Sequence, residues 1–159
     1  MNQSTPLSAL RIAEVAQAAR EIHRIAQLEL ASELGRLVLD ELYDSDLQRL
    51  RARGASDVTL RLLAFHGELP LGPSDLYDTL AIFEVIEAFG GVDACRHIGA
   101  RHIRAVLGLS LPAQLALLER AERCCWSVRE LQNAVDGQSG WRRRRVHGAM
   151  TSCTAPSAA

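Results

Sequence analysis

Apolar residues recur every three or four positions along residues 8–43, which is the spacing of an amphipathic α-helix. The repeat predicts one long N-terminal helix. Because this helix is long for a globular domain, we expect it either to bend near residues 32–35 or to extend its first half from the domain and pair with a partner. Packing across the other helices of the same chain is an alternative of equal weight. The apolar stripe consists of Ile12, Val15, Ala19, Ile22 and Ala26.

Glycine, proline and capping residues divide the following segment into shorter predicted helices. A short helix is expected before Gly54, and a second one over residues 56–66. After a turn that contains glycine and proline, Ser74 is expected to cap a helix that ends at Gly90. The apolar stripe of this helix consists of Leu76, Leu80, Phe83, Ile86 or Val85, and Phe89.

Four more helices are expected in the rest of the chain. Residues 92–98 and 101–107 form two short predicted helices, and Ser110 begins a third. The fourth has the most specific start, the sequence WSVREL at residues 126–131, because it combines a capping box with a hydrophobic staple. The capping box consists of Ser127 and Glu130, and the staple of Trp126 and Leu131.

These patterns predict an all-α fold of about eight helices, in which one long N-terminal helix precedes a compact bundle that contains a helix-turn-helix. Three regions are expected. Residues 1–43 form the long helix, with dimerisation as one alternative, and residues 44–136 form the helical domain. Residues 137–159 form a flexible basic tail, because small and polar residues surround its arginine cluster.

The charge of the chain is nearly balanced, with eighteen arginines, no lysine and a formal net charge of −1. The chain as a whole therefore lacks the strongly basic character of many nucleic-acid-binding proteins, so any basic surface has to be local. No apolar run reaches the roughly 18 residues that cross a bilayer, and charged residues interrupt the position of a signal peptide. These features predict a cytoplasmic protein with no membrane partner.

The helix over residues 56–66, the turn and the helix that begins at Ser74 together form the sequence pattern of a helix-turn-helix. Two helices around a turn occur in most all-α proteins. The pattern by itself is therefore weak evidence for DNA binding, and the motifs that surround it carry more information.

These motifs resemble the N-terminal helix-turn-helix region of the YhcG family of nuclease-associated proteins. In that family a long helix with Gly-Arg near its end precedes an S-x-L-Y helix, an S-H-x-R-x-L-L helix and the sequence W-S-V-R-E-L. Residues 101–107 and 127–129 are also similar to the GHARALL and SVR elements of the DNA-binding middle domain of ParB and KorB partition proteins. The resemblance covers approximately residues 30–136. The matching residues are Gly35, Arg36, Ser74, Leu76, Tyr77, His102, Arg104, Val106, Leu107 and residues 126–131.

The resemblance implies a DNA-binding or DNA-associated regulatory protein with a degenerate helix-turn-helix. Neither the YhcG nuclease domain nor the ParB nucleotide-binding domain fits in this chain, so we expect no enzymatic activity and no cofactor. Groove contacts are expected from Ser74, Tyr77, Asp78 and Thr79. Phosphate contacts are expected from Arg96, Arg101, His102, Arg104, Arg142, Arg143, Arg144 and Arg145.

The helix over residues 74–89 raises an electrostatic objection to DNA binding. It contains four carboxylates and no arginine, and exposed carboxylates would be repelled by phosphates. The alternative function is a protein–protein interaction module, an adaptor or DNA mimic whose acidic helix binds a basic partner. This alternative requires a continuous negative face along residues 75–87.

Metal and thiol chemistry are not expected. The residues that lie close together in the sequence are Asp93, Cys95, His97 and His102, but their spacing lacks the paired CxxC or HxxxH arrangement of zinc sites. Cys124 and Cys125 have no evident orienting group or oxyanion donor beside them. We therefore interpret the cysteines as buried free thiols.

Overall fold

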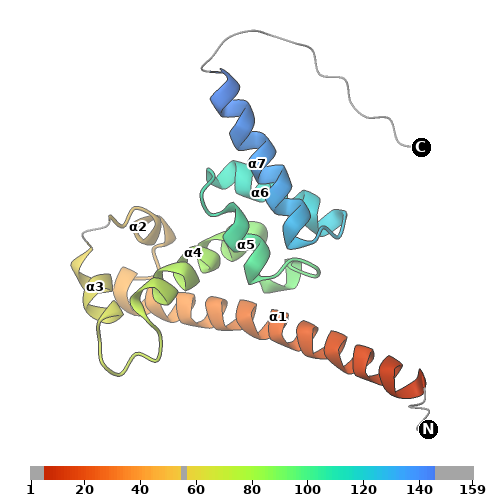
Figure 1. Ribbon diagram of the computed structural model, residues 1–159. Helices are drawn as coiled ribbons and strands as arrows, with labels where there is room; N and C mark the ends of the chain where they lie inside the picture. The colour runs from red at the N-terminus through yellow and green to blue at the C-terminus, as the bar shows by residue number, and fades with distance from the viewer. Residues whose placement is uncertain (1–5, 55–56, 146–159) are drawn as a thin grey trace.

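The computed structural model describes residues 6–54 and 57–145, and all regular structure within them is helical (Figure 1). The predicted all-α fold with a long N-terminal helix is confirmed. Seven α-helices and one short 3₁₀ helix agree with the expected number of about eight. The elements are α1 (Pro6–Tyr43), α2 (Leu47–Arg51), α3 (Val58–Ala64), α4 (Pro73–Phe89), η1 (Val92–Ala94), α5 (Ala100–Val106), α6 (Leu111–Arg123) and α7 (Val128–Arg145).

The core forms where α4 packs against α1 and is covered by α3, α5 and α6. Leu80 and Phe83 of α4 belong to one apolar cluster, which includes residues of α1, α2 and α3. Val85 and Ile86 belong to a second cluster, which includes residues of α5, α6 and α7. Leu76, Leu80, Phe83 and Ile86 of the predicted apolar stripe are thus buried, and Phe89 is partly buried. Because α4 contributes to both clusters, it is the central helix of the fold.

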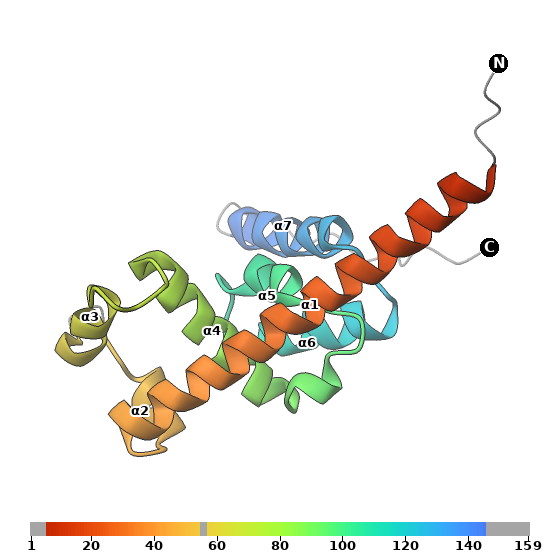
Figure 2. The same ribbon diagram turned by 90° about the horizontal axis from the view of Figure 1, so that it is seen from below.

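The long helix α1 is continuous from Pro6 to Tyr43 and does not break near residues 32–35. It passes through Gly35 without interruption, and the missing Cβ at this position makes room for the side chain of Phe83. The N-terminal half of α1 projects beyond the other helices, as Figures 1 and 2 both show. Ile12 and Val15 of the predicted stripe are exposed on this projecting part, and Ile22 is exposed further along the helix.

The predicted start of α4 and the helix predicted over residues 92–98 are wrong. Helix α4 begins at Pro73 with Gly72 as its N-cap, and not after Ser74, because the fixed φ of proline suits the first helical position. The helix expected over residues 92–98 is reduced to η1, because the following backbone donates and accepts hydrogen bonds with side chains of other helices.

Helix α7 begins as predicted but ends later than expected. The Ser127 hydroxyl oxygen accepts a hydrogen bond from the Glu130 N–H at 3.3 Å, and Glu130 Oε2 accepts one from the Ser127 N–H at 2.7 Å. The capping box is therefore confirmed. Residues 137–145, which we expected in the flexible tail, continue the helix. The remainder of that predicted tail, residues 146–159, lies outside the described residues.

Candidate nucleic-acid interface

Where the chain passes from α3 to α4, only the first two turns of α4 are exposed to solvent. Ser74 and Asp78 are exposed, and Tyr77 is 36 % exposed. Thr79 departs from the expected groove contacts, because it is only 8 % exposed and its hydroxyl donates a hydrogen bond to the Asp75 carbonyl at 2.6 Å. This burial leaves Ser74, Tyr77 and Asp78 as the accessible members of the predicted set.

The acidic side chains of α4 are mostly paired with arginines from other elements. This pairing weakens the electrostatic objection to DNA binding, because a paired carboxylate presents less net negative charge to an approaching phosphate. Among the described residues, Asp75 is the α4 carboxylate that has no arginine within 4 Å, and it lies in the first turn, where a negative charge favours the helix dipole. The pairs are Asp78 with Arg104 (3.6 Å), Glu84 with Arg53, and Glu87 with Arg36 (3.0 Å).

The predicted phosphate contacts in and before α5 are three exposed arginines and one partly buried histidine, His102. Arg96, Arg101 and Arg104 are exposed. Arg101 and Arg104 are three residues apart, so they lie on neighbouring positions of one helix face. Arg104 is already beside a carboxylate, because its Nε lies 3.6 Å from Asp78 Oδ2. The positive charge of Arg101 is therefore less compensated by a carboxylate than the charge of Arg104 is.

His102 is wrongly predicted as a phosphate contact, because both of its ring nitrogens are used inside the fold. Nε2 donates a hydrogen bond to the Trp126 carbonyl at 2.9 Å, and Nδ1 accepts one from the Gly99 N–H at 3.1 Å. An acceptor at Nδ1 requires the neutral ring. Burial also lowers the pKa of His102. His102 therefore acts as a neutral link between α5 and the start of α7.

The segment between η1 and α5 is held by side chains that the sequence analysis did not single out. Arg24 Nη1 of α1 donates hydrogen bonds to the carbonyls of Cys95 and Ile98, each at 2.8 Å. The Glu122 carboxylate of α6 accepts hydrogen bonds from the N–H groups of His97 and Ile98. These bonds join residues more than twenty positions apart, so no local pattern could have indicated them.

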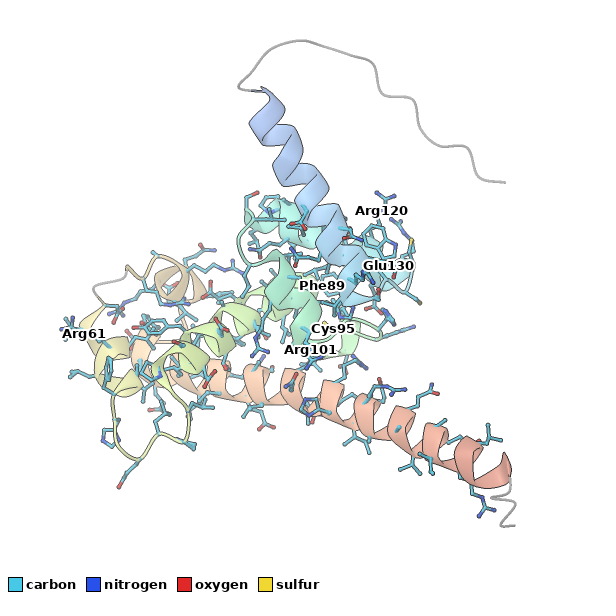
Figure 3. The ribbon with its side chains drawn as sticks, viewed as in Figure 1. Arg61, Phe89, Cys95, Arg101, Arg120 and Glu130 are labelled. Atoms are coloured by element: carbon cyan, nitrogen blue, oxygen red, sulfur yellow. The ribbon has the colours of Figure 1, made fainter. Side chains whose placement is uncertain are left out.

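A cleft with basic side chains lies between α1 and the N-terminal end of α5. Its volume is about 380 Å³, and no carboxylate is among the residues that line it. Arg20 and Arg101 have no acidic partner within 4 Å in the part of the chain that the structure describes. Figure 3 shows Arg101 where α5 approaches α1. The lining residues are Arg20, His23, Arg24, Gln27, Gly99, Ala100, Arg101, His102 and Val128.

The arginine cluster at residues 142–145 lies on the last turns of α7. In Figure 1 this end of α7 points away from α1. The backbone of the cluster is helical, and its side chains lie outside the described part of the structure. The phosphate contacts predicted for Arg142, Arg143, Arg144 and Arg145 therefore stay predictions.

The cysteines in the described residues divide between core and surface, and Cys153 lies outside the described residues. Cys95 is buried, and burial raises the pKa of its thiol to about 11. Cys124 and Cys125 are exposed, so the expectation that they are core thiols is wrong. Within residues 6–54 and 57–145, no group of three or more His, Cys, Asp and Glu side chains is arranged to hold a metal ion.

Comparisons with family models, with curated proteins and with solved structures find no match for this chain. The resemblance to YhcG and to ParB and KorB therefore stays a prediction. Among the described helices, none combines the length and the apolar character needed to cross a bilayer.

Proposed function

We propose that the protein binds DNA without catalysing a reaction, and that the exposed face of α5 and the α1–α5 cleft contact the phosphate backbone. The observation that carries this proposal is the cleft itself. It contains Arg20, His23 and Arg101 and lacks a carboxylate in its lining. Arginine side chains without an acidic partner are suited to phosphate oxygens, because the guanidinium group donates several hydrogen bonds in a fixed geometry.

The exposed face of α5 lies beside the first turns of α4. Arg104 lies on the same helix as Arg101 and beside Asp78 of α4. The exposed first turns of α4 are thus next to the basic face of α5. Ser74 and Tyr77 are the exposed side chains that remain for contact with base edges. With so few of them, we expect the phosphate contacts to dominate and sequence preference to be weak.

A regulatory role of the kind implied by the YhcG and ParB/KorB resemblance would follow from such binding, and it would place the protein in the cytoplasm as expected from the sequence. The Arg142–Arg145 cluster on α7 would add phosphate contacts at the far end of the molecule. Homodimerisation through α1 belongs to the same proposal, because dimeric DNA-binding proteins engage two half-sites.

The adaptor alternative has less support. It requires a continuous acidic face along α4, whereas three of the four carboxylates of this helix are beside arginines of other elements. A basic partner would therefore have to compete with these internal pairs. Asp75 and the carboxylate of Asp78, which is only loosely paired, are the acidic groups left for such a partner.

The proposal is tested by fluorescence anisotropy of a labelled DNA duplex at several salt concentrations. The test variant is Arg20→Ala/Arg101→Ala, which removes two cleft arginines. The matched control is Arg61→Ala, because Arg61 is exposed on α3, at one edge of the molecule and away from Arg101 in Figure 3. Circular dichroism checks that each variant is folded.

Wild-type protein should bind the duplex with a strong salt dependence. For every phosphate that the double variant no longer binds, the slope of log K against log salt should decrease by about 1, and binding should weaken for all sequences alike. Arg61→Ala should bind as wild type does. Absence of binding at low salt would contradict the proposal, and equally weakened binding in the test and control variants would contradict the role of the cleft.

A further inference from the structure

An exposed apolar stripe, the outer stripe, runs along α1 well beyond the projecting part of the helix. Its large side chains are each 52–69 % exposed, and Ala19 and Ala26 between them are exposed as well. Because an α-helix has about 3.6 residues per turn, the outer stripe lies on the opposite side of α1 from the buried Leu28, Ala31 and Val38. The core of the protein therefore leaves it uncovered. Its large side chains are Ile12, Val15, Ile22, Leu30 and Leu37.

The spacing of the outer stripe fits another helix. From Ile12 to Leu30 its members are three or four residues apart, which is the pattern of a coiled-coil seam. A second copy of this chain carries the same stripe, so two copies can bury their stripes against each other around a two-fold axis. The relative direction of the two helices then decides which side chains meet.

The order of large and small side chains favours an antiparallel pair. In a parallel pair in register, Ala19 and Ala26 would each face their own copy, and the neighbouring layers of paired Ile22 would hold the helices apart and leave gaps. In an antiparallel pair, residues whose numbers add up to about 41 can lie level. Ala19 then faces the partner's Ile22, and Ala26 faces the partner's Val15. Each small side chain thus meets a large one.

The charged side chains of this face favour the same direction. Glu29 and Glu33 are exposed on the side of the outer stripe, and a parallel pair would bring each of them against its own copy. In the antiparallel pair, Glu29 lies level with Ile12 and next to Arg11 of the partner. Glu29 and Arg11 have no oppositely charged side chain within 4 Å in the described part of the chain. The antiparallel pair therefore joins two unpaired charges.

We propose that two copies of the protein pair through the outer stripe as an antiparallel coiled coil. The N-terminal end of each α1, which projects in Figures 1 and 2, would lie along the part of the partner's α1 that carries the other helices. The two-fold axis would pass near Arg20, so the α1–α5 clefts of both copies would lie level at the middle of the dimer. This inference rests on the homodimerisation in the proposed function and adds its direction and register.

Disulfide trapping in the full-length chain tests the direction. All cysteines except the buried Cys95 are first replaced by serine. The test variant in this background is Val15→Cys/Ala26→Cys. Within one helix these two positions are about 16 Å apart, which is too far for a disulfide, so any link between them joins two copies. The matched control is Ala13→Cys/Ala26→Cys, because Ala13 is exposed but faces away from the outer stripe.

Under mild oxidation the test variant should form a covalent dimer, and mass spectrometry of its peptides should link position 15 to position 26. The control should form much less of it. Links of 15 to 15 and of 26 to 26 would overturn the antiparallel direction but keep the homodimer. A test variant that cross-links no better than the control would overturn pairing through this stripe. DNA is absent, so neither failure affects the proposed phosphate binding.

A charge exchange tests the register independently, with the dimer dissociation constant measured by analytical ultracentrifugation. Arg11→Glu and Glu29→Arg should each weaken the dimer by about threefold or more, because each dimer contains two such pairs. The double variant Arg11→Glu/Glu29→Arg should recover the affinity of the wild type. In a parallel pair the two residues are about 27 Å apart along the helices and cannot compensate each other. A double variant that does not recover would overturn the proposal.

Discussion

The ring of Phe83 lies directly against the backbone of Gly35, where α4 packs on α1. An ideal Cβ placed on Gly35 would lie 2.1 Å from Cγ of Phe83, which is far closer than two carbon atoms can approach. Phe83 is fully buried, so its ring has little room to move away. This packing sets how closely α1 and α4 approach each other.

Replacement of Gly35 by alanine should therefore destabilise the protein, even though alanine favours helix. We expect a loss of about 1–3 kcal/mol or more in the free energy of unfolding, because an added methyl group overfills a packed core. Urea denaturation followed by circular dichroism measures the change. The control is Gly67→Ala, since a Cβ at Gly67 has no atom within 4 Å, and its stability should stay within about 1 kcal/mol of wild type. Similar stabilities for the two variants would contradict the tight packing.

His102 should make the protein less stable at mildly acidic pH. Burial lowers its pKa below the ordinary value of 6.5, so the unfolded chain binds a proton more readily than the folded protein does. The stability contribution of the neutral ring is complete above pH 6.5, and it is lost as the pH falls through the lowered pKa. His97, Glu122 and Arg24 surround this ring, and a charge on His97 opposes its protonation.

The measurement is urea denaturation of wild type and His102→Gln between pH 5 and 7.5, an interval chosen to span the ordinary histidine pKa of about 6.5. The loss of stability on acidification should be smaller in His102→Gln. The control is His66→Gln, because His66 is exposed, and this variant should keep the pH dependence of the wild type. An unchanged slope in His102→Gln would show that another group is responsible.

Tyr43 should ionise only at strongly alkaline pH. Burial and the hydrogen bond that its hydroxyl donates to Asp57 Oδ2 at 2.9 Å raise its pKa to about 12. Asp57 is also the N-cap of α3, since its other carboxylate oxygen accepts a hydrogen bond from the Leu60 N–H at 3.0 Å. The hydrogen bond of Tyr43 thus joins the end of α1 to the start of α3.

A spectrophotometric titration should show one tyrosine that ionises near pH 12, and this step should be missing in Tyr43→Phe. Because the folded pKa lies above the ordinary value of 10, the stability contribution is present below pH 10 and is lost as the pH rises towards 12. At neutral pH, Tyr43→Phe should lose about 0.5–1.5 kcal/mol, the usual net contribution of one hydrogen bond. Ionisation of Tyr43 near pH 10 would contradict this hydrogen bond.

The exposed stripe on α1 predicts self-association. Ile12, Val15 and Ile22 are spaced by three and by seven residues, as on one seam of a coiled coil, and the N-terminal end of α1 projects from the body of the protein. Ile22→Glu should therefore shift a dimer to monomer, because it would place a charge in the seam. Analytical ultracentrifugation measures the mass. The control is Leu62→Glu, since Leu62 is equally exposed but lies on α3. A monomeric wild type would contradict dimerisation through this stripe.

Several elements were predictable because the interactions that form them are local. The capping box of Ser127 and Glu130 closes within one helical turn, and Gly90 ends α4 with a φ of 110°, a conformation that glycine adopts at low cost. The buried stripe of α4 follows from helical periodicity. Where two local signals competed, at Pro73 and Ser74, the preference of proline for the first helical position prevailed.

The charge distribution of the candidate interface could not be derived in this way. The four carboxylates of α4 suggested an acidic surface, yet Arg36, Arg53 and Arg104 come from three other segments to meet three of them. Arg20 and Arg101 line one cleft although they are far apart in the sequence. Periodicity and capping depend on neighbours within a turn or two, whereas these arrangements exist only because α4 and α5 pack against α1. The sequence determines which side chains are charged, but the pairing of those charges depends on which helices meet.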